Sequence, residues 1–328
     1  MKLGYAIASE EHQPRDLVRY AQMAEEAGFS FALISDHYHP WIDQQGHSPF
    51  VWSVIGAIAE ATSRIELGTG VTCPTTRIHP AIIAQAAATS AVMMPGRFFL
   101  GVGTGEALNE HILGQQWPPA NRRLEMLEEA IEVIRLLWQG GYKSHYGRFY
   151  TVENARIYTL PESPPPVVVA ASGPESAELA GRVGDAFCST SPDEEVVRRF
   201  NDTGGAGKPR YGMVTVCWAS DEASARVTAL KQWPNAAIGG QLSQELALPL
   251  FYEQAAETVT EDHIAEFIAC GPDAEKHIEM INKYAAGGFD HICVHQVGPD
   301  QEGFFGFYQR EIMPALDLVP SGLQRVRA

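Results

Sequence analysis

The residue types best suited to proton chemistry are concentrated in residues 35–41, which read Ser-Asp-His-Tyr-His-Pro-Trp. This segment follows the apolar run 31–34, which is short and bulky enough to be a buried strand. Pro40 prevents the segment from continuing as a helix. A carboxylate, two imidazoles and an indole this close together can build a site in which one group orients another. The segment therefore predicts a site just past the carboxyl end of a strand, which is the active-site face of an α/β barrel.

Two other interpretations of this segment stay open. Asp36 can cap the next helix while His37 is an ordinary buried histidine. His37 and His39 also form a His-x-His pair, the spacing with which some metal-dependent hydrolase barrels bind zinc. Such a site needs further ligands from later strands, and of the later histidines only His295 is placed to point inward at a strand end. We therefore expect no metal.

Small residues follow two later apolar runs. Residues 101–110 read Gly-Val-Gly-Thr-Gly-Glu-Ala-Leu-Asn-Glu, so Glu106 leaves a strand end near the same rim as His37. Glycines at such a turn let the backbone approach a ligand closely, although they also serve ordinary turns. Residues 68–74 end another strand with small side chains and can form the floor under a flat ring.

Two further strand ends carry groups that could bind a ligand. Residues 170–174, Ala-Ala-Ser-Gly-Pro, open onto a helix whose free N–H groups can hold a phosphate. A simple strand-to-helix turn has the same composition, so this interpretation is one of two. Glu10 adds a carboxylate at the end of the first strand.

Strand-like and helix-like segments alternate along nearly the whole chain. Because consecutive parallel strands need right-handed helical crossovers, this order predicts an α/β protein with a (β/α)8 barrel. A doubly wound open sheet is the alternative, but no GxGxxG motif follows the first strand. The predicted strands are residues 2–7, 31–35, 65–71, 98–103, 166–171, 186–189, 211–218 and 291–297.

Two insertions are expected within a single domain of residues 1–328. Residues 141–165 have two aromatic-rich arms around a glycine, which predicts a hairpin-like insertion. Residues 233–270 include a stretch of weak periodicity and are assigned to an insertion over the barrel mouth. Residues 201–207, rich in glycine, are expected to form a flexible loop.

Composition excludes several classes of partner. The chain carries 24 Lys and Arg against 40 Asp and Glu, a formal charge of −16 that repels nucleic acid and anionic lipid. It has no long apolar run, and its first residues lack the pattern of a signal peptide, so we expect a cytoplasmic protein without a membrane segment. The five cysteines are scattered and read as buried reduced thiols.

Residues 35–41, 46–50 (Gly-His-Ser-Pro-Phe) and 101–110 together resemble the F420-dependent glucose-6-phosphate dehydrogenases, members of the luciferase-like TIM-barrel oxidoreductases. The resemblance covers nearly the whole chain and implies coenzyme F420, a deazaflavin that carries hydride at C5 and ends in a phosphate and an oligoglutamate tail. It also implies a non-proline cis peptide bond between Gly70 and Val71. The implied cofactor-binding residues are Asp36, Gly70, Val71, Gly103, Thr104, Gly105, Asn109, Ala171, Ser172 and Gly173.

The resemblance also implies catalytic roles. His37 matches the family's proposed base, which removes the hydroxyl proton as hydride leaves the same carbon. Glu106 matches the group proposed to act near N1 of the reduced deazaflavin, and Trp41 would wall the substrate against the ring. Asp36 is assigned to the cofactor because adjacent residues of an extended chain point in opposite directions.

The chain departs from the family where a sugar phosphate would bind. The family places lysines after the sixth strand and in the mouth insertion, where this chain has residues 190–195 without lysine and Gln254. Glucose 6-phosphate is therefore not the expected substrate, and a neutral, partly apolar secondary alcohol is favoured. Glu10, Thr190 and Gln254 are the candidate substrate-binding residues.

The alternatives are an FMN-dependent luciferase-like monooxygenase, an F420-dependent sugar-phosphate dehydrogenase with a relocated phosphate pocket, and a cofactor-binding barrel without turnover. His37, Trp41 and Glu106 argue against the monooxygenase. Because relatives pair through barrel helices, the resemblance also implies a homodimer.

Overall fold

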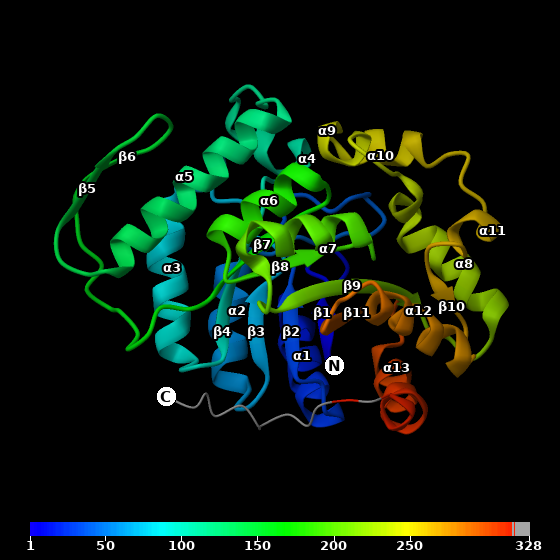
Figure 1. Ribbon diagram of the computed structural model, residues 1–328. Coiled ribbons are helices and arrows are strands. Elements are labelled where there is room, and N and C mark those ends of the chain that lie inside the picture. Colours follow the sequence, from blue (N-terminus) through cyan, green and yellow to red (C-terminus); the bar gives the residue numbers. More distant parts are fainter. Residues whose placement is uncertain (317, 319–328) are drawn as a thin grey trace.

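The computed structural model describes residues 1–316 and 318, and its strands form one closed parallel barrel (Figure 1). The pairing of β8 with β9 closes the sheet. In barrel order the strands are β1 (Lys2–Ile7), β2 (Phe31–Ile34), β3 (Glu66–Thr69), β4 (Phe98–Val102), β7 (Val167–Ala170), β8 (Ala186–Ser189), β9 (Arg210–Cys217) and β11 (His291–Gln296). The predicted (β/α)8 barrel is confirmed, and all eight predicted strand segments contain a strand.

A helix follows each barrel strand. These helices are α1 (Pro14–Ala27), α2 (Val51–Ala61), α3 (Pro80–Met93), the pair α4 (Ala107–Glu110) and α5 (Ala120–Trp138), α6 (Pro174–Val183), α7 (Glu194–Phe200), α8 (Glu222–Gln232) and α13 (Gln301–Phe307). Local sequence sets their ends: α1 begins with Pro14 and stops at Gly28, whose φ of 99° is left-handed. No helix among the described residues is long and apolar enough to cross a membrane.

Strand residues alternate between two cores, as a period of two requires. Inward-facing side chains fill the barrel, among them Phe31, Phe99 and Tyr211. The outward-facing residues of the strands pack against the helices in a larger cluster. Gly4 and Gly68 leave room for the two phenylalanine rings, because an added Cβ would lie 2.4 Å from Phe31 and 2.0 Å from Phe99.

The segment expected as a hairpin contains the antiparallel pair β5 (Lys143–Tyr146) and β6 (Thr151–Ala155). Figure 1 shows it reaching out past α5, on the side of the barrel away from α8. Glu129 on α5 anchors the turn of this hairpin, because its carboxylate accepts hydrogen bonds from the backbone N–H groups of Arg148, Phe149 and Tyr150. The same carboxylate lies 3.2 Å from His145.

The segment expected over the mouth is built of short elements. They are η3 (Pro234–Ala237), α9 (Leu242–Glu245), α10 (Pro249–Ala255), α11 (Glu261–Ile264) and β10 (Ala269–Cys270), which pairs with β9 before α12 (Ala274–Ala286). The loop expected at 201–207 was partly wrong, because η2 (Asn201–Gly205) continues α7 as a helical turn. Gly205 is buried there against Phe200, and Gly204 has a φ of 104°.

Glycine 101 marks a close approach of two barrel strands and gives a stability test. Its Cβ in a Gly101→Ala variant would lie 1.9 Å from the carbonyl oxygen of Thr69, so the backbones must separate. We expect a loss of about 3 kcal/mol or more in the free energy of unfolding, measured by urea denaturation. The control is Gly56→Ala within α2, where an added Cβ meets nothing within 4 Å and helix propensity should add about 1 kcal/mol. Equal stability of Gly101→Ala and the parent protein would contradict this account.

Candidate functional site

His37 and Glu10 meet where the neighbouring strands β1 and β2 end. The His37 Nε2 atom lies 3.4 Å from the Glu10 Oε1 atom, and only 9% of the His37 side chain and 3% of the Glu10 side chain are exposed. His37 Nδ1 lies 3.2 Å from the carbonyl oxygen of His39. Since a carbonyl oxygen can only accept, Nδ1 donates to it, and Nε2, beside the Glu10 carboxylate, is the ring nitrogen that is placed to exchange a proton.

The carboxylate of Glu10 is held in place by serines. The Ser35 hydroxyl donates to Glu10 Oε2 at 2.5 Å, and the Ser35 Oγ accepts the N–H of Ser9 at 2.8 Å. Glu10 therefore keeps a fixed orientation toward His37. It was predicted only as a substrate contact, and the structure places it against the candidate base.

Trp41 covers the exposed edge of His37. The two ring centroids lie 4.8 Å apart in an edge-on arrangement, and Trp41 in turn contacts Tyr252 of α10 at 5.3 Å. Tyr252 is fully buried, and its hydroxyl donates to the carbonyl oxygen of Ser243. Burial, with a smaller effect of the Glu106 carboxylate, raises the pKa of Tyr252. The mouth insertion thus supplies one aromatic wall of the site.

A second buried cluster joins Asp36 to the loops after β3 and β4. The Asp36 carboxylate accepts from the Thr72 hydroxyl at 2.7 Å and from the Arg77 guanidinium at 2.8 Å. Arg77 also bonds Glu110, through its N–H at 2.6 Å and its Nε at 3.5 Å. Burial acts to lower the pKa of Arg77, but the Asp36 and Glu110 carboxylates together favour the charged guanidinium and the net shift is upward. Burial raises the pKa of Glu110 to about 7, against the opposing effect of Arg77.

Asn109 ties the helix that carries Glu106 to the His37 segment. Its Oδ1 accepts the N–H groups of Tyr38 at 2.8 Å and His39 at 3.2 Å, and its Nδ2 lies 3.4 Å from Glu106 Oε2. Asn109 is buried, whereas Glu106 is half-buried at the start of α4. These bonds give Asn109 an anchoring function besides the cofactor contact that the sequence predicts.

The predicted cofactor-binding residues line adjacent strand ends. The peptide bond between Gly70 and Val71 is cis, as the resemblance implied. Gly103 is adjacent to both Val71 and Ala170, since an added Cβ would lie 2.8 Å and 3.4 Å from their side chains. Thr104 and Gly105 continue this rim, and Gly105 has a φ of 76°. Ala171 follows β7, and its N–H donates to the carbonyl oxygen of Cys188 on the neighbouring strand β8.

The start of α6 offers donors to an anion. Among the described residues, the N–H groups of Ser172 and Gly173 donate to the Ser176 hydroxyl alone, at 3.2 and 3.1 Å, and an added Cβ at Gly173 would meet nothing within 4 Å. A flat ring with a phosphate therefore fits these residues: small side chains leave the backbone uncovered at three strand ends, and α6 supplies N–H groups.

Two predicted substrate residues lie apart from the His37 cluster in their contacts. Thr190 and Gln254 are exposed, and among the described residues neither side chain forms a hydrogen bond or ring contact with Glu10, His37 or Trp41. Near Thr190, the Asp193 carboxylate caps α7 by accepting the N–H groups of Glu195 and Val196. Neither place supplies a cation.

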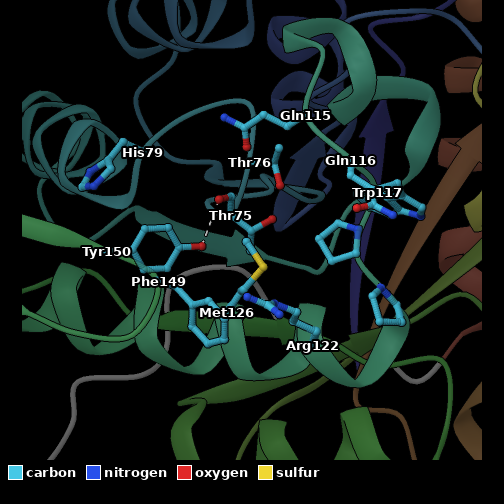
Figure 2. A pocket seen from close by; sticks show the side chains of 12 residues that line it. Thr75, Thr76, His79, Gln115, Gln116, Trp117, Arg122, Met126, Phe149 and Tyr150 are labelled. Atoms are coloured by element: carbon cyan, nitrogen blue, oxygen red, sulfur yellow. Dashed lines mark hydrogen bonds between the residues drawn. The ribbon is translucent and has the colours of Figure 1, made fainter.

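A cavity of about 510 Å³ lies beside the turn that follows β3 and the segment that leads into α5 (Figure 2). It is lined by the turn after Cys73, the residues that lead into α5, and the end of the hairpin. Figure 2 shows Tyr150 next to Thr75, whose carbonyl oxygen accepts the tyrosine hydroxyl at 3.0 Å. His37, Trp41 and Glu106 do not line this cavity, so it is not where the candidate base acts.

Sequence reasoning missed two buried groups near the mouth. Nothing in the sequence marked Arg77 as a site residue, apart from its being a cation after a predicted strand. Glu11 and His295 form a second pair, with His295 Nε2 at 2.9 Å from Glu11 Oε2, and the inward position expected for His295 could have suggested it. Among the described residues, no group of three or more His, Cys, Asp and Glu could hold a metal ion. All five cysteines are free thiols.

Comparison with known proteins gives a consistent assignment. The luciferase-like monooxygenase family model matches residues 1–291. The F420-dependent glucose-6-phosphate dehydrogenase of Microbacterium testaceum (strain StLB037) is 36% identical, over 96% of this chain and 97% of its own length. The enzyme of that name from Mycolicibacterium fortuitum is 35% identical, over 96% and 98%.

Solved structures agree with the sequence matches. An F420-dependent secondary alcohol dehydrogenase, in complex with an F420-acetone adduct, superposes with a TM-score of 0.90 at 28% identity, over 96% of this chain and 99% of that one. The tetrahydromethanopterin reductase from Methanopyrus kandleri shares the fold, with a TM-score of 0.77 at 22% identity, over 96% and 99%. The barrel, its glycine-lined rim and these matches together show that the chain belongs to the luciferase-like family, among relatives named as F420-dependent dehydrogenases.

Proposed function

We propose that this protein is an F420-dependent dehydrogenase that oxidises a neutral secondary alcohol, or reduces the corresponding ketone in reverse. The observation that carries the proposal is the His37–Glu10 contact at the ends of β1 and β2, with the Trp41 ring packed against His37. Hydroxyl oxidation needs a base at the carbon that loses hydride, and this cluster supplies one. The relatives support the choice of cofactor, since one has bound an F420-acetone adduct.

His37 performs the proton transfer. Its Nε2 accepts the hydroxyl proton while the alcohol carbon loses a hydride, so the substrate loses two hydrogen nuclei and two electrons overall. The protonated ring then donates from Nδ1 to the His39 carbonyl and from Nε2 toward Glu10, whose negative charge balances the new positive charge. Trp41 shelters this ion pair from water.

Coenzyme F420, when bound, accepts the hydride at C5. Gly70, Val71, Gly103, Thr104 and Gly105 would hold its ring, with Asp36 and Asn109 at the edge. Ala171, Ser172 and Gly173 would hold its phosphate at the α6 N-terminus. Glu106 stands half-buried at the start of α4 and is assigned to the polar edge of the ring.

The substrate assignment rests on aromatic walls and missing cations. Trp41 and Tyr252 form an apolar face beside His37, and Trp233 packs against His295 at 4.4 Å. A sugar phosphate would need paired cations, each charged bond contributing roughly 1.5–3 kcal/mol. The aligned positions here hold exposed Thr190, the α7 cap Asp193, and Gln254 instead. The names of the curated relatives keep glucose 6-phosphate as the second candidate.

We also propose a cytoplasmic homodimer, formed by a single domain that does not bind nucleic acid. The charge of −16 supports the last point. For the dimer, α3 contains no charged residue and exposes Ile82, Val92 and Met93.

The first test is a titration of the purified protein with F420 and with FMN, followed by a screen of alcohols for loss of F420 absorbance. We expect tight binding of F420 alone, with bleaching by a neutral secondary alcohol and little by glucose 6-phosphate. Preference for FMN would contradict the proposal and favour an FMN-dependent monooxygenase. Bleaching by glucose 6-phosphate would establish the second candidate.

Replacing the base separates chemistry from binding. His37→Ala should lower turnover about a hundredfold or more, as loss of a general base does, while F420 affinity stays nearly unchanged. The matched control is His145→Ala, which removes a histidine with a similar carboxylate contact on the distant hairpin. Stopped-flow reduction of F420 gives the rate, and fluorescence quenching gives the affinity. Unchanged turnover in His37→Ala would refute the assignment.

Removing the charge beside the base tests the partner. Glu10→Gln keeps the size of the side chain and can still accept from Ser35, but it leaves protonated His37 without its counter-charge. Loss of one charge-assisted bond, roughly 1.5–3 kcal/mol, predicts a fall in kcat of about tenfold to a hundredfold. Steady-state kinetics check this, with Glu129→Gln on α5 as the control. An equal loss in both variants would mean that the effect is on folding.

A further inference from the structure

Arg77 connects three consecutive strand ends through buried contacts. Its guanidinium donates to the side chain of Asp36 after β2, and to the Asp36 carbonyl at 3.4 Å. Its backbone N–H and Nε reach Glu110 on α4, after β4. Arg77 itself follows β3 by a short turn, and only 7% of its side chain is exposed. One planar cation thus bridges two carboxylates that belong to neighbouring loops.

This bridge lies between groups assigned to the cofactor. Asp36 is the residue before His37, and Glu110 is four residues after Glu106, one helical turn away on α4. Thr72, which donates to Asp36, belongs to the same turn as Arg77 and follows the Gly70–Val71 peptide. A change in the bridge therefore moves Asp36, α4 and this turn relative to one another.

We propose that Arg77 is a positioning residue: by bridging Asp36 and Glu110, it holds the loops that would bind the deazaflavin ring in place. The proposal rests on the proposed function, because it assumes F420 between these loops. Arg77 is not assigned to the alcohol, since its hydrogen bonds and ion pairs within the described part of the chain are to Asp36 and Glu110 and not to His37, Trp41 or Glu10.

Burial of the Glu110 carboxylate in this bridge disfavours its charged form. The charged and titratable groups acting on Glu110 are Arg77 and Glu106, and Glu110 in turn acts on Cys73 and Tyr150. Because the pKa of Glu110 is raised from 4.5 to about 7, its ionisation removes stability as the pH rises through that range. A carboxylate that destabilises the fold at neutral pH, and still accepts from both the backbone N–H and the Nε of Arg77, is typical of a functional position.

The experiment compares Arg77→Lys with the double variant Arg77→Lys/Glu110→Gln. A lysine ammonium keeps the charge but cannot hold both carboxylates in one plane. We expect Arg77→Lys to fold, to bind F420 at least tenfold more weakly, and to keep the alcohol KM within about twofold. In the double variant Glu110 no longer needs a partner, so thermal stability should recover while F420 affinity does not.

Several outcomes would overturn the proposal. Parental F420 affinity in Arg77→Lys would do so, and so would full recovery of affinity in the double variant, which would leave charge balance as the only function of Arg77. Arg148→Met, which removes an exposed hairpin cation, is the control for net charge. If the parent protein itself does not bind F420, the proposed function fails instead, and the two failures are distinguishable.

A pH series gives a second, independent readout. The bridge is complete only when Glu110 is ionised, so F420 affinity relative to that of Glu110→Gln should increase from pH 6 to pH 8, on either side of the Glu110 pKa of about 7. Taking the ratio of the two proteins removes the titration of the cofactor itself. A constant ratio would contradict the bridging role.

Discussion

Closure of the sheet by the β8–β9 pairing is the constraint on which the candidate site depends. In a closed parallel barrel every strand delivers its carboxyl end to one rim, so residues distant in sequence become neighbours. Glu11 and His295 are 284 positions apart and lie 2.9 Å apart, because β1 pairs with β11. Glu10 and His37 meet for the same reason across β1 and β2. The contacts of the site are thus a consequence of strand order, because side chains at the ends of paired strands are close enough to bond one another.

The rim concentrates negative charge in a chain that is already acidic. Glu10, Asp36 and Glu110 are buried there, and each is stabilised differently. Glu10 has the Ser35 hydroxyl and the His37 ring, and Asp36 has Arg77 and a threonine hydroxyl. Glu110 accepts from the backbone N–H and the Nε of Arg77, and burial outweighs these contacts and raises its pKa to about 7. Buried carboxylates cost stability unless they are paired, so the barrel core must offset their cost.

The sequence predicted what depends on local pattern and failed where partners are distant. Apolar runs located all eight barrel strands, and the hairpin followed from its aromatic arms and glycine. The loop expected at residues 201–207 was partly wrong, because glycine composition does not reveal that residues 201–205 form a helical turn in which Gly205 packs against Phe200. His37, Trp41 and Asp36 were placed at a strand end correctly. The partners that orient them, Glu10 for His37 and Arg77 for Asp36, could not be derived, since no spacing encodes which strand lies next to which.

The dipeptide Asp36–His37 divides the mouth into two halves. Adjacent residues on extended backbone point to opposite sides, and the contacts follow this rule: Asp36 faces the loops after β3 and β4, whereas His37 faces β1 and the mouth insertion. The half around Asp36 is built of glycines, backbone and one buried ion bridge, which suits a large invariant ligand. The half around His37 is walled by Trp41 and by Tyr252 of the inserted segment, whose sequence can change without moving a barrel strand. Under the function proposed above, such a division would let one fold keep its cofactor while its substrate changes, as the names of the relatives, for a sugar phosphate and for a secondary alcohol, illustrate.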